Sequence, residues 1–66
     1  MMDITIHLRE LREAQGLTQQ QLADKAGVSI KSINAVERGQ CLPGAYNLCL
    51  FAKGLGCTLN DLVTFE

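Results

Sequence analysis

The side chains that most often carry out catalysis or bind metals are few in this sequence and lie far apart. There is one histidine, His7, and three cysteines, Cys41, Cys49 and Cys57, without a Cys-x-x-Cys pair. A zinc site needs four soft ligands, and an odd number of cysteines argues against a disulfide framework. We expect Cys49 and Cys57 to be small buried residues and Cys41 to be an exposed thiol. These patterns predict no enzyme, no bound metal and no cofactor.

A second group of polar side chains is closely spaced and has a different chemistry. Lys31, Ser32, Asn34 and Arg38 bring an ammonium, a hydroxyl, an amide and a guanidinium group into one short segment. On the outer face of a helix, such groups can contact the phosphates and base edges of duplex DNA, because the major groove admits a helix and displays a distinct pattern of donors and acceptors. This chemistry requires a helix that is held outward.

Apolar residues at spacings of three and four, separated by breaks, predict five helices. They cover residues 4–15, 18–26, 29–37, 44–54 and 58–63. Thr18, Ser29 and Thr58 are typical N-terminal caps, and the glutamine three residues after Thr18 completes a capping box. Gly27 ends the second helix as a left-handed C-terminal glycine would, and Pro43 opens the fourth helix.

The two ends of the chain fit two structures. Ile4 and Ile6 alternate with polar residues, and so do Val63 and Phe65, which is the period-two pattern of a strand. These fragments either pair as a small terminal β-ribbon or form the start of the first helix and a frayed tail. The expected fold class is therefore all-α, a compact five-helix domain with the ribbon left open.

Size and composition limit the protein to one small domain. The chain has 66 residues, 47% of them apolar, and we expect residues 1–66 to form a single domain around one core. A chain this short buries only roughly 60% of its unfolded surface, so self-association is expected. The net charge of −1 and the pI of about 5.7 argue mildly against a strongly basic nucleic-acid-binding protein. No apolar stretch approaches the ~20 residues that span a bilayer, and no signal pattern is present, which predicts a cytoplasmic protein without a membrane segment.

The second and third helices, joined by a glycine turn, predict a helix-turn-helix over about residues 18–37. At about 100° per residue, Ile33 and Val36 face the core, whereas Lys31 and Ala35 face outward. The outer face of the third helix is therefore the expected contact surface.

Several motifs, spaced along the chain, are typical of a known family. They are L-R-x-x-x-G-L-T-Q-x-x-L-A from Leu11, A-G-V-S from Ala26, I-x-x-x-E-x-G from Ile33, and a later P…L…A-K-x-L-G. Over about residues 4–63, the sequence resembles the phage-repressor and Cro class of helix-turn-helix domains, the XRE family. The resemblance implies a five-helix lambda-repressor-like fold, binding to double-stranded operator DNA and a two-fold dimer.

The resemblance also implies roles for particular residues. The residues expected to meet base edges are Ile30, Lys31, Ser32 and Ala35. Those expected to contact phosphates or the DNA backbone are Gln19, Asn34, Arg38 and Gln40. An ion pair that ties the first helix to the third is expected between Arg12 and Glu37. Dimer contacts are expected in the last helix and tail, at Leu59, Leu62, Val63 and Phe65.

Some of these roles have alternatives. Gln19 also fits a solvated residue in the first turn of a helix, and Ile30 lies close enough in direction to Ile33 to pack partly inward. As a base contact, Ile30 offers only apolar surface, for example to a thymine methyl group. The loop after the third helix often carries Lys or Arg in this family, but here it reads Gln40-Cys41-Leu42. Fewer phosphates would then be neutralised, and the leucine would be exposed.

Two functions remain in competition. The first is a sequence-specific DNA-binding transcriptional regulator, a repressor that reads a palindromic operator as a homodimer. Such a protein would be bacterial or phage-encoded and associated with the nucleoid. The alternative is an antitoxin-like or adaptor module that uses the same fold to hold a protein partner. The low charge and the apolar C-terminus suggest this alternative.

Overall fold

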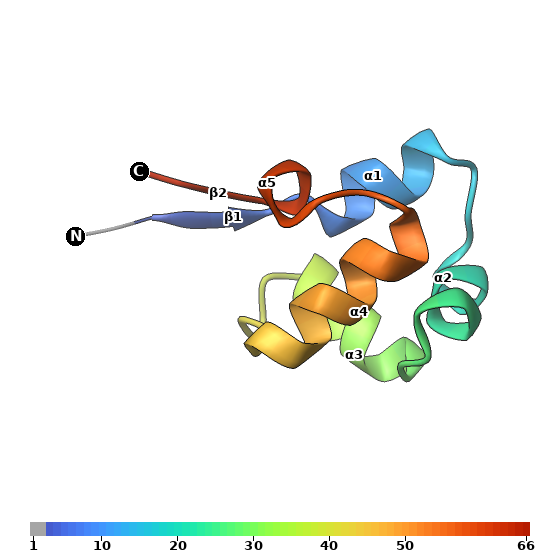
Figure 1. Ribbon diagram of the computed structural model, residues 1–66. Helices are drawn as coiled ribbons and strands as arrows, with labels where there is room; N and C mark the ends of the chain where they lie inside the picture. The colour runs from blue at the N-terminus through green and yellow to red at the C-terminus, as the bar shows by residue number, and fades with distance from the viewer. Residues whose placement is uncertain (1–2) are drawn as a thin grey trace.

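The molecule consists of a helical body and a short β-ribbon. The computed structural model describes residues 3–66. In chain order, its elements are β1 (Ile4–Ile6), α1 (Leu8–Ala14), α2 (Gln19–Ala26), α3 (Ile30–Glu37), α4 (Ala45–Leu55), α5 (Leu59–Leu62) and β2 (Val63–Phe65). The helices gather in one body, and the two strands extend together from one end of it, next to both chain ends (Figure 1).

Every helix contributes one large, fully buried side chain to a single core. These side chains, each 0% exposed, are Leu8 of α1, Leu22 of α2, Ile33 of α3, Phe51 of α4 and Leu62 of α5. Each such residue stabilises the folded chain by roughly 1.5–3 kcal/mol relative to leaving it in water. The five expected helices are thus confirmed, and their apolar faces meet at one centre.

The helix caps expected from the sequence are present. The hydroxyl oxygens of Thr18, Ser29 and Thr58 each accept a hydrogen bond from a backbone N–H three residues later. Thr18 and Thr58 both belong to complete capping boxes. Because a cap is a contact between near neighbours in the chain, the local sequence is enough to predict it.

α4 approaches α2 at short range. A Cβ added to Gly54, in the last turn of α4, would lie only 2.9 Å from the Cβ of Ala26. Its position alone suggests that Gly54 merely weakens the end of the helix, but the structure shows that the missing side chain allows the two backbones to approach. The other end of the helix also differs slightly from expectation, because α4 begins at Ala45, after Pro43 rather than at it.

The two chain ends form the ribbon that the sequence left open. The strands are antiparallel, with Ile4 opposite Phe65, Thr5 opposite Thr64 and Ile6 opposite Val63. The expected helix start at residue 4 is wrong, because α1 begins at Leu8. His7 marks the change. Its N–H donates to the carbonyl of Leu62 at 2.7 Å, and its Nε2 lies 3.0 Å from the hydroxyl oxygen of Thr64.

Two residues are buried differently from expectation. Leu62 was expected at a dimer surface, but it is 0% exposed within the chain's own core and has no surface to offer a partner. Cys49 was expected to be buried but is exposed. It lies two positions before Phe51, about 200° around α4, so the helix that buries Phe51 turns Cys49 to solvent.

The remaining cysteines and the helix lengths give two further facts. Cys41 is exposed and Cys57 is half-buried. Burial, with the nearby Asp61 carboxylate, raises the pKa of the Cys57 thiol. Among residues 3–66, no helix is both long and apolar enough to cross a bilayer.

Candidate nucleic-acid interface

The turn between α2 and α3 fixes the direction of α3. Gly27 has a left-handed φ of 73°, and its N–H and that of Val28 both donate to the carbonyl of Ala23, at 2.9 and 3.1 Å. Ser29 then caps α3, and its hydroxyl oxygen accepts from the N–H of Ser32 at 3.1 Å. Only Gly27 and Val28 therefore separate the last residue of α2 from the cap of α3, which is the geometry of a helix-turn-helix.

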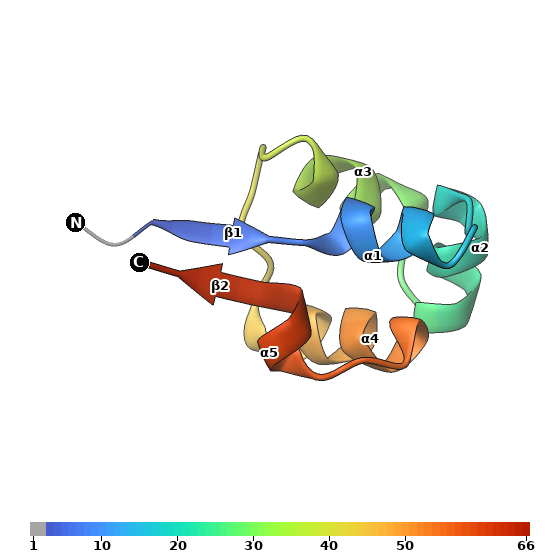
Figure 2. The ribbon, with the colours of Figure 1, turned by 90° about the horizontal axis from the view of Figure 1, so that it is seen from above.

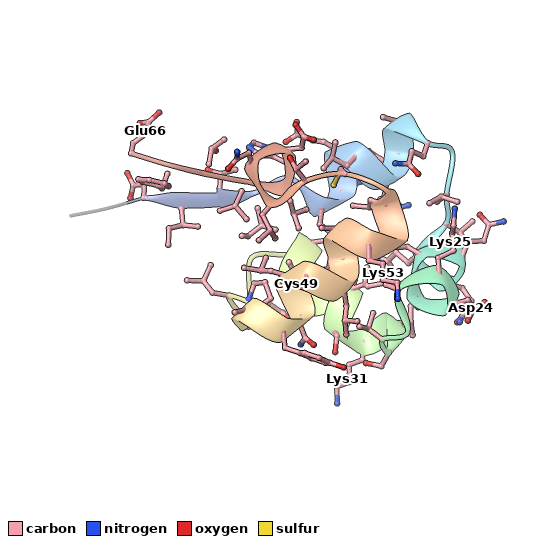
Figure 3. The ribbon with its side chains drawn as sticks, in the orientation of Figure 1. Asp24, Lys25, Lys31, Cys49, Lys53 and Glu66 are labelled. Carbon is pink, nitrogen blue, oxygen red and sulfur yellow. The ribbon has the colours of Figure 1, made fainter. Side chains whose placement is uncertain are left out.

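α3 has an inner face that packs and an outer face that meets solvent. Ile33 and Val36 are 0% and 7% exposed in the core. On the other side Lys31 is exposed, and it projects from the lower edge of the body, away from the other helices (Figure 3). Ile30 is 43% exposed, so it does not belong to the buried face. The remaining expected base contacts, Ser32 and Ala35, are half-buried on the same helix.

An ion pair connects the end of α3 to α1. Arg12 Nε donates to Glu37 Oε2 at 2.8 Å, and Arg12 Nη2 donates to Glu37 Oε1 at 3.1 Å. Arg12 Nη1 also donates to the carbonyl of Leu17 at 2.7 Å. The two charged side chains are only 12% and 4% exposed. This two-bond contact is the ion pair expected between the first and third helices, and its geometry fixes both partners.

Gln19 joins this network rather than pointing into solvent. Its Nε2 donates to Glu37 Oε1 at 3.0 Å and lies 3.5 Å from Asn34 Oδ1. The side chain expected to hold a phosphate is therefore already engaged within the protein. At the start of α2 the N–H of Gln21 donates to the hydroxyl oxygen of Thr18, and the N–H groups before it have no partner within the helix. A single sequence could not reveal the contact, because Gln19 and Glu37 are neighbours only through the fold.

The charge state of Glu37 follows from its surroundings. Burial opposes ionisation of the carboxyl group, but hydrogen bonds from Arg12 and Gln19, together with the positive charge of Arg12, outweigh it. The pKa of Glu37 therefore lies below its ordinary value of 4.5. The same contact raises the pKa of Arg12. The ion pair is thus fully charged near neutral pH.

The outer face of α3 borders a groove of about 320 Å³. Lys31, Ser32 and Ala35 line one side, and the loop after α3 with the start of α4, including Asn47, lines the other. α4 has a glycine N-cap, Gly44, and no side-chain cap, so the first N–H groups of α4 have no side-chain partner. The sequence predicted the start of this helix but not that it and Asn47 would line a groove beside α3. The available signal was a polar residue in the first turn of a helix without a Ser, Thr, Asp or Asn cap.

Positive charge on this side comes from Lys31 and Arg38. Arg38 is the C-cap of α3 and is exposed. Gln40, just beyond it, is also exposed, and its N–H donates to the carbonyl of Ala35 at 2.9 Å. The structure thus brings Lys31, Arg38 and Gln40 to solvent on or just after α3, while Asn34 is half-buried and accepts weakly from Gln19.

A family model described as helix-turn-helix matches residues 8–62, from the start of α1 to the end of α5. The HTH-type transcriptional regulator DdrOP3 of Deinococcus deserti is 34% identical over 62 residues, which cover 94% of this chain and 48% of that protein. The cryptic phage CTXphi transcriptional repressor RstR of Vibrio cholerae is 36% identical over 61 residues, covering 92% of this chain and 54% of the repressor. This chain therefore spans about half the length of these two relatives.

Two further comparisons cover most of both chains. An uncharacterised HTH-type transcriptional regulator of Methanocaldococcus jannaschii is 36% identical over 59 residues, with 89% of each protein covered. The crystal structure of the restriction-modification controller protein C.AhdI from Aeromonas hydrophila superposes with a TM-score of 0.80, at 36% identity and 83% coverage of each chain. The match to the family model contains the capped turn, α3 and the ion pair behind it. The chain therefore belongs to the helix-turn-helix family, in its phage-repressor and Cro-like branch, the XRE family.

Proposed function

We propose that this chain is a sequence-specific DNA-binding transcriptional regulator, a repressor that reads a palindromic operator in the major groove as a homodimer. The observation that carries the proposal is the arrangement of α3. Its inner face is buried, its start is capped by Ser29, and Lys31 and Ile30 stand exposed on its outer side. A helix held in this way can enter the major groove as a rigid body, so binding does not require the helix to become ordered first.

The contacts can be divided into those that read bases and those that fix position. Lys31 and Ser32 supply polar groups for base edges, and Ile30 and Ala35 supply apolar surface. Arg38, Gln40 and Asn34, with the N-terminus of α2, supply phosphate contacts, which position the protein without reading sequence. Because the Gln19 side chain is held by Glu37, the backbone of α2 carries the phosphate contact that the side chain was expected to make.

The name of one relative supports the role of repressor, and a physical argument supports the homodimer. RstR is named as a transcriptional repressor and C.AhdI as a controller protein. Residues 3–66 contain a single α3, and a two-fold dimer would double the contact area and match a palindrome. Such a protein would act in the cytoplasm, on the nucleoid or on phage DNA, with no cofactor and no catalytic step.

The direct test is selection of bound duplexes from a random DNA pool by the whole chain. We expect enrichment of a palindrome whose half-sites are centred about one helical turn apart, roughly 10 base pairs. The same selection with a Lys31→Ala variant should relax the preference at one or two positions of each half-site. A pool that shows no enrichment with the wild-type chain contradicts the proposed function.

A protein-interaction module built on the same fold is the second candidate. Leu42 is 65% exposed and Phe65 is 70% exposed, and these two apolar side chains are the surface that a protein partner would cover. Capture experiments from nuclease-treated extracts would test it. Recovery of a stoichiometric protein partner, together with no sequence preference in the DNA selection, would favour this candidate over the first.

A further inference from the structure

The terminal ribbon has an open edge. In an antiparallel pair, the residues alternate between those that exchange hydrogen bonds across the ladder and those whose N–H and C=O groups point away from it. Asp3 and Glu66 exchange both of their bonds, at 3.0 and 2.9 Å. By alternation, Thr5 also faces its partner strand, whereas the main-chain groups of Ile4 and Ile6 point outward. Within residues 3–66, no chain segment pairs with this outer edge of β1.

The two edges of the ribbon are not equivalent. On β2, the N–H of Val63 is already used, because it donates to the carbonyl of Leu59 at the end of α5. On β1, the hydrogen bonds of the described residues leave both Ile4 and Ile6 with a free donor and a free acceptor. An added strand therefore finds a full set of outward groups only on the β1 edge.

The side chains of the ribbon are also divided between two faces. Ile4 and Ile6 lie on the same face as their partners Phe65 and Val63, because paired residues point to the same side of a sheet. Ile6 and Val63 pack against the core. Ile4 and Phe65, nearer the tip, remain 39% and 70% exposed. This exposed apolar tip belongs to an element that lies outside the family match at residues 8–62.

We propose that the outer edge of β1 pairs with β1 of a second copy of this chain, so that two ribbons form one four-stranded antiparallel sheet. A two-fold axis at Thr5 places Ile4 of each copy opposite Ile6 of the other. Each of these two pairs exchanges two main-chain hydrogen bonds, and the apolar faces of both ribbons become continuous. This pairing would supply the homodimer of the proposed function, and only in that respect does it rest on that function. The pairing itself is a property of the protein without DNA.

The orientation of the ribbon favours a second copy over an unrelated strand. The two-fold axis of an antiparallel edge pair is perpendicular to the sheet. Figure 2 shows both strand arrows broadside, so in the view of Figure 1 the sheet normal runs vertically. In that same view, Lys31 projects from the lower side of the body (Figure 3). Rotation about the axis therefore leaves both α3 helices on the same side of the dimer, where one duplex can meet them.

The side chains on and beside β1 also favour pairing with a second copy of β1. With the axis at Thr5, Asp3 of one copy lies opposite His7 of the other on the polar face, a carboxylate beside an imidazole. Two threonines, each Thr5, meet on the axis, which is a favourable cross-strand pair. A groove of about 290 Å³ runs beside β1, and its far wall includes Leu42, which is 65% exposed. An incoming strand with alternating apolar residues would cover that leucine.

The test uses two prolines that remove matched N–H groups. Ile4→Pro deletes an outward N–H of β1, and Phe65→Pro deletes an outward N–H of β2; neither bond belongs to the ladder between the strands, and proline is tolerated at such edge positions. Sedimentation equilibrium of the whole chain without DNA should show a wild-type dimer. We expect Ile4→Pro to raise the dimer dissociation constant at least tenfold and Phe65→Pro to change it less than threefold.

A second measurement does not depend on any variant folding. In the wild-type chain, hydrogen exchange at the amides of Ile4 and Ile6 should slow at least tenfold between dilute and concentrated protein, while exchange at the Phe65 amide stays the same. A chain that remains monomeric at several hundred micromolar, or a dimer equally strong with Ile4→Pro, overturns the proposal. Greater sensitivity to Phe65→Pro assigns the interface to β2 and also overturns it. Because no DNA is present, a failure here is separate from a failure of the DNA selection.

Discussion

At the scale of single residues, Glu37 connects three helices. Its carboxylate accepts two hydrogen bonds from Arg12 of α1 and one from Gln19 of α2, while Glu37 itself ends α3. Taking two charges out of water is costly, and a buried pair that loses one partner leaves an uncompensated charge. The network therefore joins α1 and α2 to the last residue of α3, and it is costly to break by removing one partner.

The first prediction concerns the pH dependence of this network. Because the pKa of Glu37 is lowered from 4.5 in the folded chain, its stabilising contribution is complete above pH 4.5 and is lost as the pH falls through the folded-state value. Glu37→Gln should lower the free energy of unfolding by roughly 1–3 kcal/mol at pH 7. Urea denaturation of both proteins between pH 3 and 7 measures this difference.

The difference between wild type and Glu37→Gln should shrink below about pH 4.5, because a protonated carboxyl group and an amide resemble each other in charge. Glu13→Gln is the matched control, since Glu13 makes only an exposed contact of 3.5 Å with Arg9. Exposed pairs of this kind contribute roughly 0–1 kcal/mol. A pH-independent difference at position 37 would show that the ionised form is not what stabilises the fold.

The second prediction concerns Lys31 as a base contact. Lys31→Ala should weaken binding to the selected operator by roughly 1–3 kcal/mol and weaken non-specific binding much less. Lys25→Ala is the control, because it removes the same charge from an exposed side chain on α2 that points away from Lys31 (Figure 3). Fluorescence anisotropy with operator and scrambled duplexes distinguishes the two. If both variants lose the same binding free energy for the operator, Lys31 contributes only its positive charge and does not contact a base.

At the scale of elements, the starts and ends of the helices were largely predictable. Thr18, Ser29 and Gly27 act through atoms within a few residues, so the sequence contains both partners of each contact. The ends of the chain could be predicted only as a pair of alternatives. A three-residue strand has no stability by itself. The packing of Ile6 and Val63 on the core and the contacts of His7 with Leu62 and Thr64 favour pairing here.

The third prediction concerns the contact between α2 and α4. Gly54→Ala should lower the free energy of unfolding by about 1–3 kcal/mol, because a new Cβ would meet Ala26 at 2.9 Å. Alanine is otherwise about 1 kcal/mol better than glycine inside a helix, so propensity alone predicts the opposite sign. Thermal unfolding followed by circular dichroism measures the outcome.

The double variant Ala26→Gly with Gly54→Ala tests the cause. Removing the Cβ of Ala26 relieves the 2.9 Å contact but leaves the Cα and N of Ala26 at 3.0 and 3.1 Å from the new Cβ. The second substitution should therefore become only partly less harmful, with a coupling energy of roughly 0.5 kcal/mol. A stabilised Gly54→Ala protein would mean that the two helices separate at little cost.

At the scale of the whole molecule, the modest positive charge of the contact surface sets how strongly salt affects binding. Fourth, if each subunit neutralises two or three phosphates, the slope of log affinity against log salt should be roughly −4 to −5 for a dimer. Operator binding measured between 50 and 300 mM salt gives this slope. A much steeper slope would mean that further cationic side chains contact phosphates. A Lys53→Ala variant would then test whether Lys53 is one of them.

The sequence by itself determined the local structure of this protein and the type of its surface. Caps, glycine stops and apolar spacing fixed five helices and the outer face of α3, because each depends on residues close together in the chain. Tertiary structure alone decided the rest. It turned Gln19 toward Glu37, buried Leu62, made Gly54 a contact point and joined the two chain ends. These outcomes depend on which distant side chains compete for the same space and the same hydrogen bonds, and only the folded chain settles that competition.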